Sequence, residues 1–213
     1  MSGRLFIARH GETVFNAAAR MQGEAPHTPL TRTGFAQAEE MGWALRELLG
    51  LRPRLDLWAS PTGRALQTLA IVAEHLELDW HDARTDPRLS EMDMGAWGGR
   101  FYRDIAAEVG PFVDRAAGLF TVQPPGGEWY DAIQSRLQAW LDDTASETGD
   151  RLVVMHGISS RVLRGMLAGL PHRPECRAPV AASLPQGSIV CVEGGAETVV
   201  YRGGGGEGVS RPA

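Results

Sequence analysis

Polar side chains capable of chemistry follow three apolar runs of this chain, at the point where each run ends. The three clusters are Arg9-His10-Gly11-Glu12-Thr13, Ser60-Pro61-x-x-Arg64 and His156-Gly157. Open α/β sheets bind ligands outside the carboxyl ends of their strands. If the three runs are neighbouring parallel strands, these histidines and arginines are expected to meet in one site. Glu91, which follows a weaker strand candidate, could join them.

This combination of side chains suits a phosphate monoester. A guanidinium group offers a planar fork of donors that matches phosphate oxygens, and two such groups neutralise a dianion and the charge of its transition state. A neutral imidazole can attack phosphorus and form a phosphohistidine, and a protonated carboxyl group can give its proton to the departing oxygen. The second histidine can donate a hydrogen bond to the phosphoryl group. Because the arginines supply the positive charge, the chemistry requires no metal ion and no cofactor.

Each of these signals also has an ordinary structural interpretation. A histidine after a strand is usually a loop residue or a satisfied core group. Ser60-Pro61-x-x-Arg64 can simply start a helix, and Glu91 can be a surface charge. We favour the catalytic interpretation because the clusters occur together and each stands just past an expected strand.

The elements that must position these residues alternate between strands and helices. Apolar runs predict strands at 5–8, 55–59, 152–155, 188–192 and 198–201, with a weak candidate at 86–89. Helical spacing predicts helices from 34 to about 50 and at 64–76, 131–145 and 162–170, with another near 103–108. The first helix has its capping candidates at 31–33, and its apolar face carries Ala38, Met41, Leu45 and Leu48. The alternation predicts an α/β protein with helices on both faces of a sheet.

We expect a single domain over residues 1–202. The chain has 213 residues, which is enough for one well-packed core. A region rich in glycine and proline includes residues 98–127, which we interpret as a cap over the site. Residues 203–213 begin with four glycines and are expected to form a flexible tail.

Composition and charge narrow the possible partners. Hydrophobic residues make up 43% of the chain and charged residues 22%, as in ordinary globular proteins. The net charge of -5 favours neither nucleic acid nor an anionic membrane as a partner. The two cysteines form no disulfide framework or metal motif, and we see no signal peptide or membrane span. We therefore expect a soluble cytoplasmic protein with a small-molecule substrate, and the sequence predicts no oligomeric state.

The motifs taken together resemble those of the histidine phosphatase superfamily, also called the phosphoglycerate mutase-like family. The resemblance covers residues 5–201, and it rests on the blocks Phe6-Ile-Ala-Arg9-His10-Gly11-Glu12-Thr13-Val-Phe-Asn16, Gln22-Gly23, Leu30-Thr-x-x-Gly34-x-x-Gln37-Ala38, Ser60-Pro61-x-x-Arg64-Ala65-x-Gln67-Thr68, Leu89-x-Glu91-x-x-x-Gly95-x-Trp97, Pro125-Gly126-Gly127-Glu128 and His156-Gly157. It implies a three-layer α/β/α sandwich around a mostly parallel sheet. One departure is Gly98-Gly99, where the family often has an acidic residue before the glycine.

The resemblance also implies roles for individual residues. His10 would be the phosphorylated nucleophile, and Glu91 would protonate the leaving group and could later activate water. The rest of the phosphate pocket would be made by Arg9, Arg64 and His156, with further contacts from Asn16, Gln22 and the Gly157 backbone.

Three functional classes are consistent with this resemblance. Glu91 and His156 are only 65 positions apart, whereas phosphoglycerate mutases generally carry a longer insertion there. This spacing favours a phosphatase that acts on a small phosphorylated metabolite. A mutase is the alternative, and a non-catalytic phosphate-binding module is a weaker one, because all five core residues are present. In the cap, Arg103 or Arg115 could contact a second acidic group, although surface arginines are commoner. At least two of Phe101, Phe112 and Phe120 are expected to pack the cap.

Overall fold

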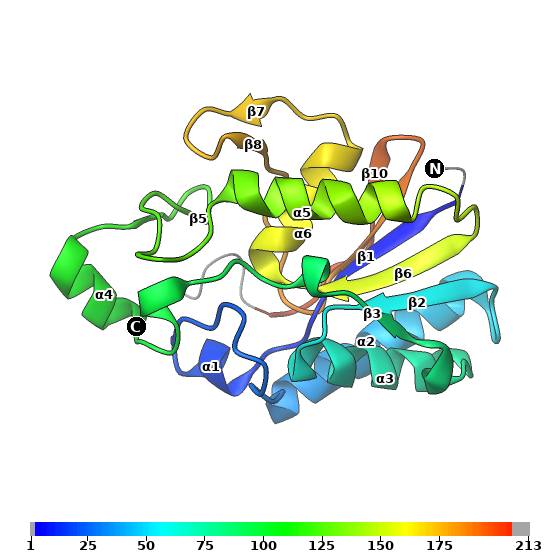
Figure 1. The fold of residues 1–213 in the computed structure, drawn as a ribbon. Coiled ribbons are helices and arrows are strands. Elements are labelled where there is room, and N and C mark those ends of the chain that lie inside the picture. The colour runs from blue at the N-terminus through cyan, green and yellow to red at the C-terminus, as the bar shows by residue number, and fades with distance from the viewer. Residues whose placement is uncertain (1–2, 206–213) are drawn as a thin grey trace.

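The computed structural model describes residues 3–205 and has an α/β fold with a mostly parallel sheet (Figure 1). The six strands have the order β10-β9-β1-β6-β2-β3. Four of them run parallel, namely β1 (Leu5–Arg9), β6 (Asp150–Met155), β2 (Leu55–Ala59) and β3 (Arg84–Thr85). β9 (Ile189–Glu193) is antiparallel to β1, and β10 (Ala196–Tyr201) is antiparallel to β9. The carboxyl ends of β1, β6 and β2 therefore lie side by side.

Two helical layers cover the sheet, which confirms the three-layer architecture (Figure 1). α2 (Arg32–Leu49) and α3 (Gly63–Leu76) pack on one face, and α5 (Tyr130–Asp143) and α6 (Gly157–Leu167) pack on the other. Strand β1 contributes side chains to the hydrophobic cores on both faces of the sheet, because successive side chains of a strand point to opposite faces. Phe6 and Ala8 join the core under α2 and α3, whereas Leu5 and Ile7 join the core under α5 and α6.

Helix α2 forms largely as its sequence predicts. The Thr31 side chain caps it by accepting a hydrogen bond from the Gly34 N–H at 3.0 Å. Gly50, with a φ of 76°, ends it. Three of the four predicted apolar positions are buried, but Leu48 is 51% exposed.

The strand predicted at 86–89 is wrong. Strand β3 comprises Arg84–Thr85 alone, and it is followed by the 3-10 helix η2 (Pro87–Leu89). Asp86 caps this helix, since its side chain accepts a hydrogen bond from the Arg88 N–H at 2.8 Å. Pro87 has no N–H for a strand ladder, and its fixed φ favours the first position of a helix.

The helix predicted at 162–170 begins earlier, because α6 starts directly after His156 at Gly157 and ends at Leu167. Several short elements had no sequence prediction. They are α1 (Val14–Ala17), η1 (Trp80–Asp82), η3 (Gly95–Trp97) and the two-stranded pairs β4 (Val113–Asp114) with β5 (Leu119–Phe120) and β7 (His172–Arg173) with β8 (Ala178–Pro179).

The segment 98–127 contains α4 (Tyr102–Val109) and the β4–β5 pair, and it packs on the core beneath α5 and α6. Tyr102, Phe112 and Phe120 stack in succession, with ring centroids 6.0 and 6.1 Å apart. Phe112 and Phe120 are buried, as expected of packing residues, and Phe101 is half-buried.

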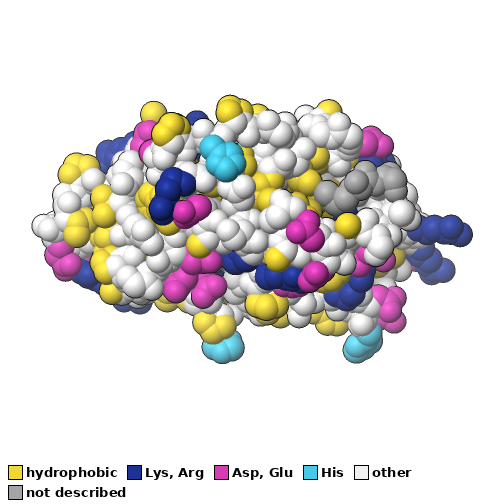
Figure 2. Space-filling model, turned by 45° about the horizontal axis from the view of Figure 1, so that its top comes forward, with side chains coloured by type: hydrophobic (Ala, Val, Ile, Leu, Met, Phe, Trp, Pro, Cys, Tyr) yellow, Lys and Arg dark blue, Asp and Glu magenta, His cyan; other side chains and the backbone are white. Residues whose placement is uncertain are grey.

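Gly203, where the expected tail begins, is buried, and its N–H donates to the Ser188 hydroxyl at 3.0 Å. Residues 206–213 of that predicted tail lie outside the described residues. No helix within residues 3–205 combines the length and apolar character needed to cross a membrane. On the face shown in Figure 2, positive and negative side chains are interspersed.

Candidate active site

The three predicted clusters meet at the carboxyl edge of the sheet. His10 follows β1, and its N–H donates to the Met155 carbonyl at 3.0 Å. His156 follows β6, and the two imidazole rings lie 5.1 Å apart in an edge-to-face arrangement. Arg64, in the first turn of α3 after β2, donates from Nε to His156 Nδ1 at 3.2 Å. The adjacency of the parallel strands thus brings together residues more than ninety positions apart.

His10 is held as a neutral imidazole with a defined tautomer. Burial, with the positive charges of Arg64 and Arg9, holds the pKa of His10 well below its ordinary value. Its Nδ1 lies 2.7 Å from the Gly11 carbonyl oxygen. Since a carbonyl can only accept, Nδ1 carries the proton and Nε2 carries the lone pair. This is the form that can act as a nucleophile.

The loop that carries His10 is fixed by two glycines in close contact. A Cβ on Gly11 would lie 2.3 Å from the Gly34 carbonyl oxygen, and a Cβ on Gly34 would lie 2.0 Å from the Glu12 carbonyl oxygen. Only glycine permits this approach of the loop to α2. The Glu12 N–H also donates to the Gln37 side chain at 2.7 Å, which binds the loop to the same helix.

His156 provides a hydrogen-bond donor beside the nucleophilic imidazole of His10. It is fully buried, and burial together with the charge of Arg64 holds its pKa well below the ordinary value. Because Nδ1 accepts from Arg64, the proton of the neutral ring resides on Nε2. That buried Nε2 has no hydrogen-bond partner among the described residues. An unpaired buried donor is costly, and a phosphoryl oxygen would satisfy it.

Arg64 is wholly buried and committed mainly to the protein. Besides His156, it donates to the carbonyl oxygens of Ala25 at 2.7 Å and Gly23 at 2.6 Å, and to the Thr28 hydroxyl at 3.1 Å. Burial lowers the pKa of Arg64 to about 10, so the group stays cationic at neutral pH. With four of five N–H groups engaged, it supplies fixed positive charge rather than a full fork of donors.

Arg9 and Gly157 lie next to each other in the site. Arg9 is buried at its guanidinium, which lowers its pKa, and it donates to the Leu184 carbonyl at 2.9 Å. A Cβ on Gly157 would lie 3.4 Å from Arg9 Cζ and 3.4 Å from Glu91 Oε2. The arginine and the carboxylate therefore both lie against the Gly157 Cα, where a side chain would contact them.

Glu91 caps the amino terminus of α6. Its oxygens accept hydrogen bonds from the N–H groups of Ile158 at 3.0 Å and Ser159 at 2.9 Å, and from its neighbour Met92 at 3.0 Å. His156, the residue at the capping position, makes no such side-chain bond. Carboxylates are favoured at helix amino termini, which explains why α6 can begin immediately after β6.

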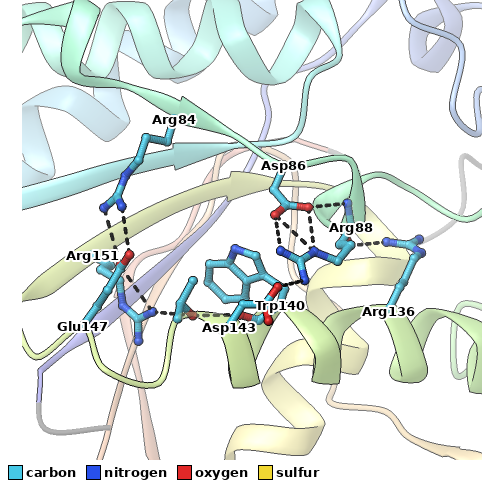
Figure 3. Close-up of polar contacts among 9 residues, drawn as sticks. Arg84, Asp86, Arg88, Arg136, Trp140, Asp143, Glu147 and Arg151 are labelled. Atoms are coloured by element: carbon cyan, nitrogen blue, oxygen red, sulfur yellow. Dashed lines mark hydrogen bonds and ion pairs between the residues drawn. The ribbon is translucent and has the colours of Figure 1, made fainter.

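The loop of Glu91 is held from α5. Arg136 donates to the carbonyl oxygens of Glu91 and Arg88, and it forms an ion pair with Glu128 at 2.9 Å. Glu128 in turn accepts from the Asp93 N–H at 3.1 Å. Figure 3 shows Arg136 reaching the backbone of Arg88, whose own guanidinium lies between Asp86 and Asp143.

Asn16 and Gln22 lie on either side of the Thr13 hydroxyl. Thr13 Oγ1 is 2.8 Å from Asn16 Oδ1 and 2.5 Å from Gln22 Oε1, and the Thr13 N–H also donates to Asn16. Both residues line the pocket. Since their amide oxygens face Thr13, their NH2 groups are the donors left for a ligand.

One pocket joins these residues. It encloses about 560 Å³ of empty space with its open mouth included. Six predicted residues line it, namely Arg9, His10, Asn16, Gln22, Glu91 and Gly157. Arg64 and His156 adjoin it through their contacts with each other and with His10.

Sequence reasoning missed two charged residues of the pocket, and the two cap arginines that it considered for substrate contact do not line it. Arg20 and Arg161 line the pocket, but Arg103 and Arg115 are exposed and outside its lining. Arg161 lies one helical turn after Gly157, so the spacing of four residues could have indicated it. Arg20 had no comparable signal. Within the described part of the chain, no three His, Cys, Asp or Glu side chains are grouped as a metal site would need.

Comparison with known proteins identifies the family of this chain. In sequence, a probable phosphoglycerate mutase GpmB of Erwinia tasmaniensis is 32% identical over 177 residues, which cover 82% of this chain and 79% of that protein. A solved mycobacterial glucosyl-3-phosphoglycerate phosphatase is similar with a TM-score of 0.72 and 27% identity, covering 92% of this chain and 96% of the other. The alpha-ribazole phosphatase of Shigella flexneri is similar with a TM-score of 0.71 and 26% identity, covering 92% and 94%. A family model described as the histidine phosphatase superfamily (branch 1) matches residues 5–201, so the chain belongs to that superfamily.

Proposed function

We propose that this chain is a phosphomonoester hydrolase that works through a phosphohistidine on His10. The observation that carries the proposal is the state of His10, a buried neutral imidazole with its Nε2 lone pair unblocked by the Gly11 contact. The ring stands beside a buried N–H of His156 that lacks a partner. Arg9, Arg64 and Glu91 complete the group of side chains that phosphoryl transfer needs.

The reaction has two balanced steps. His10 Nε2 attacks phosphorus, the N–P bond forms, and the P–O bond to the alcohol breaks while Glu91 gives a proton to the departing oxygen. The carboxylate of Glu91 then takes a proton from water, whose oxygen attacks phosphorus as the N–P bond breaks. Inorganic phosphate and the alcohol leave, and His10 and Glu91 return to their starting forms.

The remaining residues hold the phosphoryl group. Arg64 supplies fixed charge, and Arg9 and His156 add charge and a hydrogen bond. The NH2 groups of Asn16 and Gln22, together with the Gly157 backbone, are further donors at the pocket wall. The positive charge comes from arginine, so the proposed reaction does not use a metal ion.

A mutase is the second candidate, because the sequence relative described above is named a phosphoglycerate mutase. A mutase shares the first step but passes the phosphoryl group to a bound hydroxyl instead of water. The short interval between Glu91 and His156 and the phosphatase names of both similar structures favour hydrolysis.

The test is phosphate release from p-nitrophenyl phosphate and a panel of metabolite phosphates in EDTA, with His10→Ala as the control. We expect release by the wild type alone and an acid-labile phosphoryl label on the wild type alone. Equal release by both proteins would refute the role of His10. Interconversion of 3-phosphoglycerate and 2-phosphoglycerate without phosphate release would identify the mutase.

A further inference from the structure

Two arginines line the pocket without a part in the proposed reaction. Arg20 and Arg161 both contact the cap segment 98–127, so they lie on the side of the pocket where the alcohol part of a substrate would extend. Each has a structural setting that leaves its charge without an acidic partner.

Arg20 is held in place by aromatic rings. Its guanidinium carbon lies 4.5 Å from the Phe101 ring centroid and 5.6 Å from that of Phe15. Its Nε is buried without a hydrogen-bond partner, and the side chain makes no ion pair within residues 3–205. Stacking orients the planar fork but leaves its donors available, which is the arrangement used to bind acidic groups.

Arg161 is held by backbone carbonyls. It is 3% exposed and donates to the carbonyl oxygens of Ala181 at 2.8 Å, Gly118 at 2.7 Å and Ala117 at 2.9 Å. Three of its five N–H groups are thereby used, and two remain. No carboxylate pairs with it within the described residues. Burial lowers the pKa of Arg161 to about 10, which still leaves a cation at neutral pH.

The charge balance of the pocket exceeds what one phosphate needs. The charged residues lining it are Arg9, Arg20, Arg161 and Glu91, and Arg64 adjoins it. Their formal charge is three positive units with Glu91 ionised and four with Glu91 protonated, as the first step of the reaction requires, and a monoester dianion neutralises two of these units. Because buried charge is costly when it is unpaired, the remaining positive charge favours a ligand with one more acidic group.

We propose that Arg20 and Arg161 form a second anion subsite, which binds an acidic group on the alcohol part of the substrate. The preferred substrates are then phosphate monoesters that also carry a carboxylate or a second phosphate. This inference rests on the proposed function, because it assigns the leaving-group side of the same pocket. Arg103 is not part of the subsite, since it is exposed and lies near Asp104 at 3.5 Å.

The experiment compares substrates that differ in one acidic group. The pair glycerol 3-phosphate and 3-phosphoglycerate tests a carboxylate, and the pair fructose 6-phosphate and fructose 1,6-bisphosphate tests a second phosphate. We expect kcat/KM to favour the acidic member of at least one pair by about tenfold or more. In Arg20→Gln that ratio should fall towards one, mainly through KM, whereas the control Arg115→Gln, at an exposed cap residue outside the pocket lining, should keep it. Arg161 also holds the cap, so Arg161→Lys, which keeps the charge, is the second variant and should give an intermediate ratio.

A ratio near one for both pairs in the wild type would overturn the subsite, as would a preference that persists in Arg20→Gln. Failure of the hydrolase proposal is distinguishable, because it would appear as no His10-dependent release from p-nitrophenyl phosphate. In that case the subsite is judged by calorimetric binding of the same pairs to His10→Ala protein. There the acidic member should bind about tenfold more tightly, and the double variant with Arg20→Gln should lose the difference.

Discussion

At the scale of single residues, the arginines control the histidines as well as the charge of the pocket. The Nε of Arg64 donates to His156 Nδ1, and this fixes the tautomer whose proton is on the buried, unpartnered Nε2. The same positive charge lowers the pKa of both histidines, after the larger effect of burial. Beside two arginines, both imidazole rings are therefore neutral. A neutral His10 can act as the nucleophile, and a neutral His156 can donate a hydrogen bond.

Glu91→Gln tests the assignment of the proton donor. Glutamine keeps a carbonyl oxygen that can accept from the α6 N–H groups, so the variant should stay folded. It cannot deliver a proton, so hydrolysis of an alkyl phosphate should fall by about 10²-fold or more, whereas p-nitrophenyl phosphate, whose leaving group needs little protonation, should be affected much less. The measurement is kcat/KM on both compounds, and equal losses would contradict the assignment.

Three of the candidate residues could be found from the sequence because each lies at the carboxyl end of an apolar strand. Arg9, His10 and His156 are adjacent to strands whose hydrophobicity is unmistakable, and parallel pairing then brings their ends together. Arg20 could not be found in this way. Its position follows from stacking on Phe101, a residue 81 positions away, and no local pattern encodes that contact.

At the scale of elements, the placement of Glu91 depends on α5. The ion pair between Arg136 and Glu128 joins α5 to the loop before it, and Arg136 also donates to the Glu91 and Arg88 carbonyl oxygens. Arg88 is bound in turn by Asp86 and by Asp143 at the end of α5 (Figure 3). Glu128, the last residue of the Pro125-Gly126-Gly127-Glu128 motif, therefore has a structural role in holding the loop of Glu91.

Arg136→Ala should displace the loop of Glu91 without touching the pocket lining. We expect kcat to fall roughly tenfold or more on an alkyl phosphate and less on p-nitrophenyl phosphate, because misplacing a catalytic group is costly even over short distances. The same leaving-group pattern as Glu91→Gln would mark Arg136 as a positioning residue. Equal losses on both compounds, with a lower melting temperature, would instead indicate general destabilisation. Arg84→Ala, at an exposed ion pair on β3, is the matched control.

The elements that the sequence did not predict depend on non-local or side-chain contacts. Helix α6 was predicted to start at 162 because its first turn has little apolar periodicity, yet Glu91 from a distant loop caps it at Gly157. The strand at 86–89 failed for a local reason, since Asp86 and Pro87 favour a capped 3-10 turn. Strands β1, β2 and β6 were predicted within one or two residues, because continuous apolar runs are typical of buried parallel strands.

At the scale of the whole molecule, the site lies where two hydrophobic cores and a cap meet. The core under α2 and α3 supports Arg64, and the core under α5 and α6 supports His156 and Glu91. The chain carries a net charge of -5, whereas the charged residues at the pocket are predominantly arginines. Binding of an anionic substrate therefore depends on the local positive potential of the pocket, because the molecule as a whole is negative. The affinity for the anion should fall as the salt concentration rises, because salt screens this potential.

The stability of the whole fold should depend on pH through the two buried histidines. Their folded pKa values lie well below the ordinary value of 6.5, so below pH 6.5 the unfolded chain binds protons that the folded site does not. Their contribution is thus fully present above pH 6.5 and is lost as the pH falls from there, at up to about 1.4 kcal/mol per pH unit for each histidine. Asp86 and Asp150 contribute to the pH dependence of stability at more acidic pH. Burial tends to raise their pKa values, but hydrogen bonds from Arg88 and Arg4 bring them below 3.8.

Urea unfolding between pH 7.5 and 5 measures this dependence. The free energy of unfolding of the wild type should decrease as the pH is lowered over this range. In His156→Asn its pH dependence should be smaller, by up to about 1.4 kcal/mol per pH unit, because one histidine no longer contributes. His81→Asn, at an exposed histidine, is the matched control and should keep the wild-type slope. A wild-type stability that is flat from pH 7.5 to 5 would mean that the site admits protons in the folded state. Both rings could then be charged together, and the neutral nucleophile on which the proposed reaction depends would be lost.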